Sequence, residues 1–145
     1  NEHELEGDGG HPKYSSLIQS AVAVSGVFDF IAWFTDKRHI ALQPKVDTKV
    51  LQNGEWVGPA FSPNNKHWLR ASAINHVDKD DPVIMFLHCE DDSTVPWLQS
   101  EEMNEKMKAI GIGSSTVFYE TGGHGYKGLG DKPMAEMVRF FKKTL

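Results

Sequence analysis

The chain has 145 residues, of which 39% are hydrophobic and 24% are charged, a composition typical of a single globular domain. Its 15 basic residues are outnumbered by 20 acidic ones, which leaves a net charge of −5, and no basic run alternates with aromatic residues, so we expect no nucleic-acid partner. No apolar run approaches the roughly 18 residues of a membrane span, and the single Cys89 excludes an internal disulfide. The compartment stays unknown.

The first part of the chain contains short apolar and aromatic runs. A Gly/Pro-rich loop is expected at 7–13, and the apolar run at 17–24 predicts a buried strand that ends before Ser25-Gly26. Residues 28–42, FDFIAWFTDKRHIAL, favour one or two short helices with poor caps. His39 in this segment is expected at the surface.

The segment KVLQNGEWV at 49–57 carries Asn-Gly between two β-prone runs. This pattern is typical of a type I′ turn, so we predict a small β-hairpin with Asn53 and Gly54 at its centre. A helical turn is expected around 66–73. The hairpin would form an excursion on the surface of the fold.

The second half has clearer periodicity. VIMFL at 83–87 is uninterrupted and apolar, as in a strand covered on both faces, and apolar residues recur at helical spacing over 98–110. A further strand is predicted at 115–120, and a helix after Asp131, which we expect to be its N-cap. Strand, helix, strand, helix is the order of an α/β fold with a parallel sheet.

Polar residues follow both strands of this half. HCEDDSTVPW at 88–97 follows the first strand and TGGHG at 121–125 follows the second. Because the carboxyl ends of parallel strands lie at one edge of a sheet, we expect Asp92 and His124 to be close in space. An Asp that orients a His is the base half of a nucleophilic triad. His88 is expected to have a structural role at the end of its strand.

These segments also carry a family resemblance. VIMFLHCEDDSTVPWLQSEEMNEKMKAIG, followed by VFYETGGHGY, resembles the C-terminal part of α/β-hydrolase-fold serine esterases. ELEGDGGHPKYSSLIQSAVAVSGVFDF is similar to the segment that follows the nucleophile helix in the branch with acetyl-xylan and feruloyl esterases. The resemblance implies a carboxylic ester hydrolase in which Asp92 is the triad acid and His124 the general base.

The chain departs from the family pattern at two places. The family has glycine where this chain has Cys89, a change that the turn tolerates if the φ angle there is negative. The nucleophile elbow Gly-x-Ser-x-Gly is missing, because the only glycines four apart, Gly54 and Gly58, flank Trp56. The resemblance therefore predicts that residues 1–145 are one domain, the C-terminal part of an α/β-hydrolase that lacks its nucleophile-bearing part, and that this chain alone is inactive.

The resemblance also implies the partners. We expect a small-molecule or carbohydrate ester as substrate and no cofactor. Three aromatic residues lie in segments that rim the pocket of such folds and are candidate substrate contacts, although core packing explains each equally well: Phe28, Phe30 and Trp97. A sheet cut after its nucleophile strand exposes an edge, so self-association or pairing with the missing N-terminal part is also expected.

Several alternatives stay open. The stretch HCEDD at 88–92 is compatible with a metal site or a solvated turn, but adjacent carboxylates point in different directions, so we predict no metal. GHGYKG at 123–128 matches a dinucleotide-binding pattern, yet no helix begins at its glycines. The chain can also be a non-catalytic half-hydrolase that acts as an interaction module, or a peptidase or dienelactone-hydrolase-like member of the fold.

Overall fold

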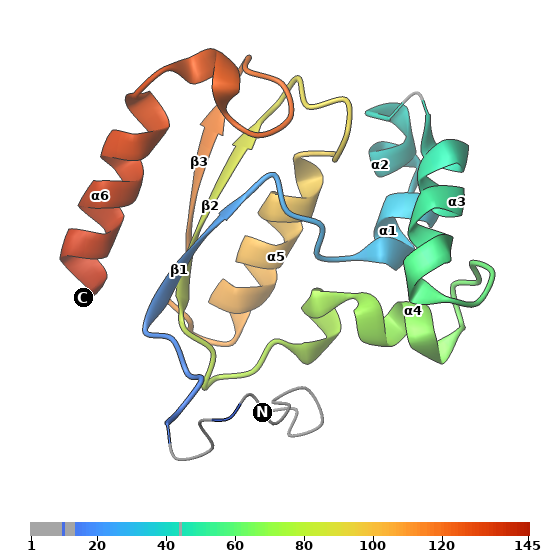
Figure 1. Cartoon of the computed structure of the whole chain (residues 1–145), viewed down its shortest axis with the longest axis horizontal. Helices are drawn as coiled ribbons and strands as arrows, with labels where there is room; N and C mark the ends of the chain where they lie inside the picture. The colour runs from blue at the N-terminus through green and yellow to red at the C-terminus, as the bar shows by residue number, and fades with distance from the viewer. Residues whose placement is uncertain (1–9, 11–13, 44) are drawn as a thin grey trace.

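The computed structural model describes residues 10, 14–43 and 45–145. Within these residues three parallel strands form one sheet in the order β1-β2-β3. The strands are β1 (Ser20–Val24), β2 (Val83–Cys89) and β3 (Ser115–Tyr119). Helix α5 (Leu98–Ala109) joins β2 to β3, and α6 (Lys132–Thr144) follows β3 after the short 3-10 helix η3 (Lys127–Leu129) (Figure 1). The predicted order of the second half is confirmed.

The central strand is β2, which pairs Leu87 with Val24 on one side and with Val117 on the other. Successive side chains of a strand point to opposite faces. Phe86, fully buried, packs against Met103 of α5 on one face, so Leu87, also fully buried, faces the other. Figure 1 shows α5 and α6 on either side of the sheet. This double coverage explains why the strand is apolar without interruption.

The first strand is shorter than predicted. It begins at Ser20, and the preceding Leu17 and Ile18 are each 58% exposed. β1 pairs only with β2 among the strands that the structure describes, so its other edge is open. The loop predicted at 7–13 lies outside the described residues except for Gly10.

Four helices form a lobe beside the sheet (Figure 1). They are α1 (Phe30–Thr35), α2 (Lys37–Ala41), α3 (Val46–Val57) and α4 (Lys66–Ala71), and the 3-10 helix η2 (Ala73–His76) leads from them toward β2. The short helices predicted at 28–42 are confirmed, but their caps are better than expected. The Asp29 carboxylate accepts hydrogen bonds from the amides of Ile31 and Ala32, and Asp36 accepts one from Arg38. These caps satisfy amides that have no partner within the helix.

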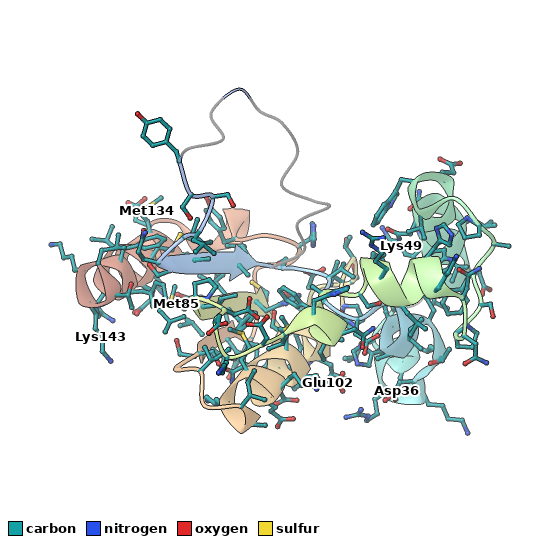
Figure 2. All side chains as sticks on the ribbon, turned by 90° about the horizontal axis from the view of Figure 1, so that it is seen from below. Asp36, Lys49, Met85, Glu102, Met134 and Lys143 are labelled. Atoms are coloured by element: carbon teal, nitrogen blue, oxygen red, sulfur yellow. The ribbon has the colours of Figure 1, made fainter. Side chains whose placement is uncertain are left out.

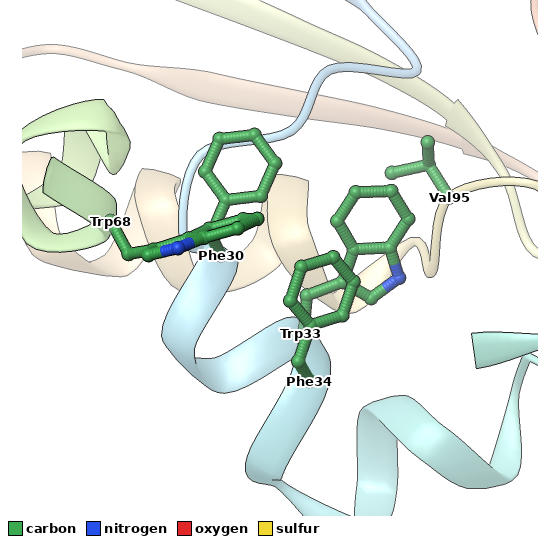
Figure 3. Close-up of a cluster of buried hydrophobic side chains, with 5 residues drawn as sticks. All are labelled: Phe30, Trp33, Phe34, Trp68 and Val95. Atoms are coloured by element: carbon green, nitrogen blue, oxygen red, sulfur yellow. The ribbon is translucent and has the colours of Figure 1, made fainter. Parts of the chain in front are cut away.

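The lobe has an aromatic core (Figure 3). Its buried members are Phe30, Trp33, Phe34, Trp68 and Val95. The Phe30 and Trp68 ring centroids are 5.6 Å apart and nearly perpendicular, and Trp33 stacks on Phe34 at 4.8 Å. Val95 belongs to the acidic turn, residues 90–97, which joins β2 to α5. The lobe core therefore extends to the loop that carries the predicted triad acid.

The predicted hairpin is wrong, because Asn53 and Gly54 lie inside helix α3. Val46, Val50 and Val57 of this helix pack against the lobe core, at a spacing that suits a helix and not a strand. The Asn53 side chain donates to the Lys49 carbonyl at 2.8 Å, one helical turn back. Helical packing thus overrides the turn preference of Asn-Gly.

A polar network joins the lobe to α5. Arg38 is 2.7 Å from both Asp36 and Glu102, which Figure 2 labels on the lobe and on α5. His39, expected at the surface, is fully buried: its Nε2 lies 3.0 Å from Glu102 and its Nδ1 3.3 Å from the Gln99 amide nitrogen. His39 is buried because it lies between α2 of the lobe and α5, where its ring contacts polar side chains of α5.

Candidate active site

The acidic turn and the glycine loop, TGGHG at 121–125, meet at the carboxyl ends of β2 and β3. Glu90 donates its amide hydrogen to the Tyr119 carbonyl at 2.8 Å, which continues the strand pairing into the loops. The His124 Nδ1 atom lies 2.9 Å from the Asp92 Oδ2 atom. The Asp92 side chain is fully buried, whereas that of His124 is 50% exposed. The predicted contact between these two side chains is confirmed.

The Asp92 carboxylate is held by four groups. Oδ1 accepts the amides of Thr94 and Val95 at 2.8 and 3.0 Å, and Oδ2 lies 3.2 Å from His88 Nε2 as well as beside His124. Burial by itself would raise the pKa of Asp92, but these hydrogen bonds outweigh it and hold the pKa well below its usual range. The carboxylate is therefore ionised at neutral pH and can only accept hydrogen bonds.

This environment decides which nitrogen of His124 carries the proton. An ionised Asp92 needs a donor, so Nδ1 is protonated and Nε2 keeps its lone pair. The His124 side chain is 50% exposed, and among the described residues Nε2 has no hydrogen-bond partner, so this nitrogen can bind a further group. The pair has the arrangement of a general base and its orienting acid.

His88 contacts the same carboxylate oxygen from inside the sheet. It is fully buried, its Nδ1 lies 2.8 Å from the Ser100 hydroxyl, and its Nε2 lies 3.0 Å from the Val95 carbonyl. A carbonyl only accepts, so Nε2 is protonated and can also donate toward Asp92. The sequence indicated a structural role for His88 but not its contact with Asp92.

The acidic turn is also fixed from the lobe. The Gln43 side chain, 1% exposed, donates to the carbonyls of Ser93 and Thr94 and accepts from the Trp33 indole. Sequence reasoning did not single out Gln43, because one glutamine far from the motif gives no pattern. Its contacts explain how the lobe orients the turn that carries Asp92.

Cys89 ends β2 directly behind the glycine loop. Among the described non-glycine residues only Ser25 has a positive φ angle, so the backbone at Cys89 tolerates a side chain, as the sequence analysis required. Its thiol is 3.7 Å from the Gly125 carbonyl and is buried. Burial, followed by the charges of Asp91 and Asp92, raises the pKa of the thiol. Cys89 is thus a protonated packing residue beneath the loop.

The three aromatic candidates for substrate contact are engaged in packing. Phe28 meets Phe86 edge to face at 5.2 Å, and Phe30 is 4% exposed in the lobe core. Trp97 keeps partial exposure and packs on Phe118 of β3 at 5.3 Å. Within the described part of the chain these residues therefore have structural roles, and contact with a substrate stays a prediction.

A group of potential metal ligands lies between the lobe and α5, away from Asp92 and His124. In the described ranges, ligand atoms of Asp36, His39 and Glu102 lie within 4.8 Å of one another. Arg38 binds both carboxylates of this group, and His39 already faces Glu102. An arginine in the centre supplies the positive charge that a cation would bring, so these residues fit an ion-pair network better than a metal site.

A surface hollow of about 550 Å³ runs along α6. It is lined by Asp131, Met134, Ala135, Val138, Arg139 and Lys142. Neither Asp92 nor His124 contributes to it. In the part of the chain that is described, no helix combines the length and the apolar character needed to cross a membrane.

Comparisons with solved structures agree with this architecture. The acylaminoacyl peptidase of Pyrococcus horikoshii matches 90% of the chain with a TM-score of 0.73 at 18% identity. The esterase Est2 of Thermogutta terrifontis matches 95% with a TM-score of 0.63 at 19% identity. The chain covers 21% and 47% of these two proteins. At such identities the likeness concerns the fold, and it confirms the α/β-hydrolase architecture.

Sequence comparison also finds a similarity to ester hydrolases. A probable carboxylic ester hydrolase of Mycobacterium tuberculosis, LipM, is 26% identical over 101 residues, which are 70% of this chain and 22% of that protein. The chain thus spans less than a quarter of the length of this curated relative. The model of the BD-FAE family matches residues 1–107, which include Asp92 but not His124. The predicted likeness to esterases of the α/β-hydrolase fold is confirmed, and the chain belongs to the BD-FAE family.

Proposed function

We propose that this chain carries two members of a Ser-His-Asp triad and belongs to a carboxylic ester hydrolase whose nucleophilic serine lies outside residues 1–145. The observation that carries the proposal is the 2.9 Å contact between His124 Nδ1 and the buried Asp92 carboxylate, in which the His124 side chain stays 50% exposed. The ester-hydrolase relative supports an ester substrate. From the sequence resemblance we expect this ester to be a small molecule or a carbohydrate.

The proposed chemistry is acyl transfer to water. The serine hydroxyl attacks the ester carbonyl while His124 Nε2 takes its proton. The imidazolium then gives this proton to the leaving alcohol, and a water molecule repeats the sequence to release the acid. Asp92 stays ionised throughout, because its bonds to backbone amides and imidazoles stabilise the charged form. It keeps the proton on Nδ1 and stabilises the imidazolium. No cofactor takes part in this scheme.

The serine is assigned to another part of the protein because no Gly-x-Ser-x-Gly occurs in the sequence. Without a hydroxyl to activate, the His124–Asp92 pair has only weak general-base ability toward water. We therefore expect residues 1–145 alone to be inactive. We also expect the backbone amides that hold the oxyanion to come from loops outside this chain.

The test compares this chain with a longer form of the protein that contains the elbow. The longer form should hydrolyse a short-chain aryl ester and be labelled by a serine-directed phosphonate, and the present chain should do neither. His124→Ala in the longer form should lower kcat by about 10³-fold or more. His67→Ala is the matched control, because His67 is an exposed histidine of α4. Labelling of the present chain at any serine would show that it holds its own nucleophile.

An amide substrate is the second candidate, because a triad alone does not choose between esters and amides. The observation that favours it is the structural match to an acylaminoacyl peptidase. The discriminating measurement is kcat/KM of the longer form on an ester and on the amide with the same acyl group. A higher value for the amide would move the assignment to peptidases.

A partner at the open edge of β1 is also proposed. Tyr14, Leu17 and Ile18, which precede β1, are 71%, 58% and 58% exposed, and the buried Ser20 hydroxyl has no hydrogen-bond partner among the residues that the structure describes. A further parallel strand from the missing part, or from a second copy, would cover this edge. This surface is also what a non-catalytic interaction module would use. Light scattering should show self-association of this chain that is lost when the N-terminal part is co-expressed. A monomer in both cases would contradict it.

A further inference from the structure

The glycine loop that carries His124 has little backbone support of its own. Gly122, Gly123 and Gly125 all have positive φ angles, of 149°, 68° and 83°. Within the described part of the chain, no backbone–backbone hydrogen bond outside the strand ladder involves residues 121–125. The amides of these glycines bond to side chains instead. The position of His124 therefore depends on the residues that supply those side chains.

Asp91 holds the amides that precede His124. Its Oδ2 accepts from the Gly122 amide at 3.2 Å, and its Oδ1 accepts from the Gly123 amide at 2.8 Å. Both oxygens are used, and the residue is exposed. Its neighbour Asp92 binds the imidazole of His124 itself. Two adjacent carboxylates of the acidic turn thus bind one loop in two ways, one at the backbone and one at the ring.

Ser25 holds the amide that follows His124. It lies directly after β1, and its own amide donates to the Leu87 carbonyl at 3.0 Å, so it extends the pairing of β1 with β2. Its hydroxyl oxygen accepts from the Gly125 amide at 3.0 Å, and the residue is 6% exposed. Its φ angle of 49° is strained for a side-chain-bearing residue. Such strain persists where the surroundings require that conformation.

We propose that Asp91 and Ser25 are positioning residues that hold the backbone on both sides of His124 and so keep its ring against Asp92. This inference rests on the proposed function, in which His124 is the general base. A base that shifts by about 1 Å can lose roughly a hundredfold in rate. Asp92 fixes only the ring nitrogen, which leaves the backbone of a glycine loop free to move unless other groups bind it.

The first test compares Asp91→Ala with Glu90→Ala in the present chain. Glu90 is the exposed neighbour, and its replacement removes the same charge without removing a bond to the glycine loop. We expect Asp91→Ala to speed amide hydrogen exchange at Gly122 and Gly123 at least tenfold and to weaken or remove the His124 Nδ1–H proton signal in NMR spectra. Glu90→Ala should leave both unchanged. Equal behaviour of the two variants would overturn the role of Asp91.

The second test compares Ser25→Gly with Ser25→Ala. Glycine relieves the strain of the positive φ angle and alanine keeps it, but both remove the oxygen that binds the Gly125 amide. If Ser25 positions the loop, both variants speed exchange at Gly125 at least tenfold and weaken the His124 Nδ1–H signal, although Ser25→Gly melts at a higher temperature than Ser25→Ala. If Ser25→Gly keeps the protected amide and the signal, Ser25 is not a positioning residue.

These measurements need no turnover, so they separate this inference from the proposed function. In a longer, active form, Asp91→Ala should lower kcat by about 10- to 100-fold with KM little changed. An unchanged kcat would refute the positioning role in catalysis. If the loop measurements come out as expected while His124→Ala has normal activity, the proposed function fails and the structural coupling stands.

Discussion

The helical lobe and the glycine loop are stabilised in different ways. In the lobe, Trp68 is fully buried and meets Phe30, Phe34 and Phe61 edge to face at 5.1 to 5.9 Å. In the loop, His124 is half exposed, and its surroundings are carboxylate, hydroxyl and thiol groups. Apolar burial is non-directional, whereas hydrogen bonds fix distance and angle. We infer that the lobe contributes mainly to stability, whereas the polar contacts at the strand ends fix the position of His124.

The two regions meet in the acidic turn. Val95 is part of the lobe core, while its amide binds the Asp92 carboxylate at 3.0 Å. The turn is thus anchored by apolar packing on one side and presents a carboxylate on the other. The glycine loop, which has little backbone support of its own, is thus aligned by the acidic turn, which is packed into the lobe core. We therefore expect changes in the lobe to affect stability most and changes at the strand ends to affect the alignment of His124 most.

The largest expected effect is on the lobe core. Trp68→Ala should lower the free energy of unfolding by about 4 kcal/mol, because it leaves a cavity among aromatic rings. Trp56→Ala is the control, since Trp56 is 63% exposed and should cost about 1 kcal/mol. Urea unfolding gives both values, and the His124 Nδ1–H signal should persist in each folded variant. Loss of that signal in Trp68→Ala would show that lobe and loop form one unit.

The next effect is on the buried carboxylate. Asp92→Asn should cost about 3 kcal/mol at neutral pH, because it removes the acceptor of two imidazoles. The pKa of Asp92 is lower in the folded than in the unfolded state, where its ordinary value is 3.8. Its contribution is therefore fully present above about pH 4 and is lost as the pH falls through the folded-state pKa. The stability difference between native chain and variant should shrink over that range. A difference that grows with acidity would contradict the ionised state.

The sequence predicted the sheet half well. An uninterrupted apolar strand, an amphipathic helix and a second strand have periodic patterns, and parallel strands bring their carboxyl ends together. Asp92 and His124 could thus be paired although 32 positions separate them. The same reasoning failed for Asn53 and Gly54, because a local turn preference carried no information about packing against the lobe core.

The supporting contacts could not be predicted from local patterns. Asp91, His88, Gln43 and Ser25 each bind the site through one or two hydrogen bonds, and the bond from Gly125 to Ser25 spans 100 positions. A single polar residue has no periodicity. Only the chain's three-dimensional course shows that these side chains reach the same two loops.

A smaller effect is expected from a methyl group at the base of the loop. A Cβ added to Gly122 would lie 2.7 Å from the Cys89 sulfur and 3.0 Å from Leu129, at a φ angle of 149°. Gly122→Ala should therefore cost about 2 kcal/mol and weaken the His124 Nδ1–H signal. Gly113→Ala is the control, because its Cβ would meet Val83 at an ordinary 3.8 Å. If the two variants are equally stable and both keep the signal, the glycine loop accommodates a methyl group more easily than the close packing around Gly122 implies.

The smallest effect is expected at Cys89. Cys89→Ala removes a buried sulfur beneath Gly122 and a weak bond to the Gly125 carbonyl, so it should cost about 1 kcal/mol and leave the His124 Nδ1–H signal in place. In the native chain the thiol is buried and its pKa is raised, which leaves little thiolate to react. Labelling by a disulfide reagent at pH 8 should therefore be at least 100-fold slower in the folded chain than in urea, because it must wait for the loop to open. Rapid labelling of the folded chain would mean that the loop opens often. The polar contacts from Asp91 and Ser25 would then be too weak to hold His124. The proposed distinction between a lobe that contributes stability and a loop that is aligned by hydrogen bonds would be wrong.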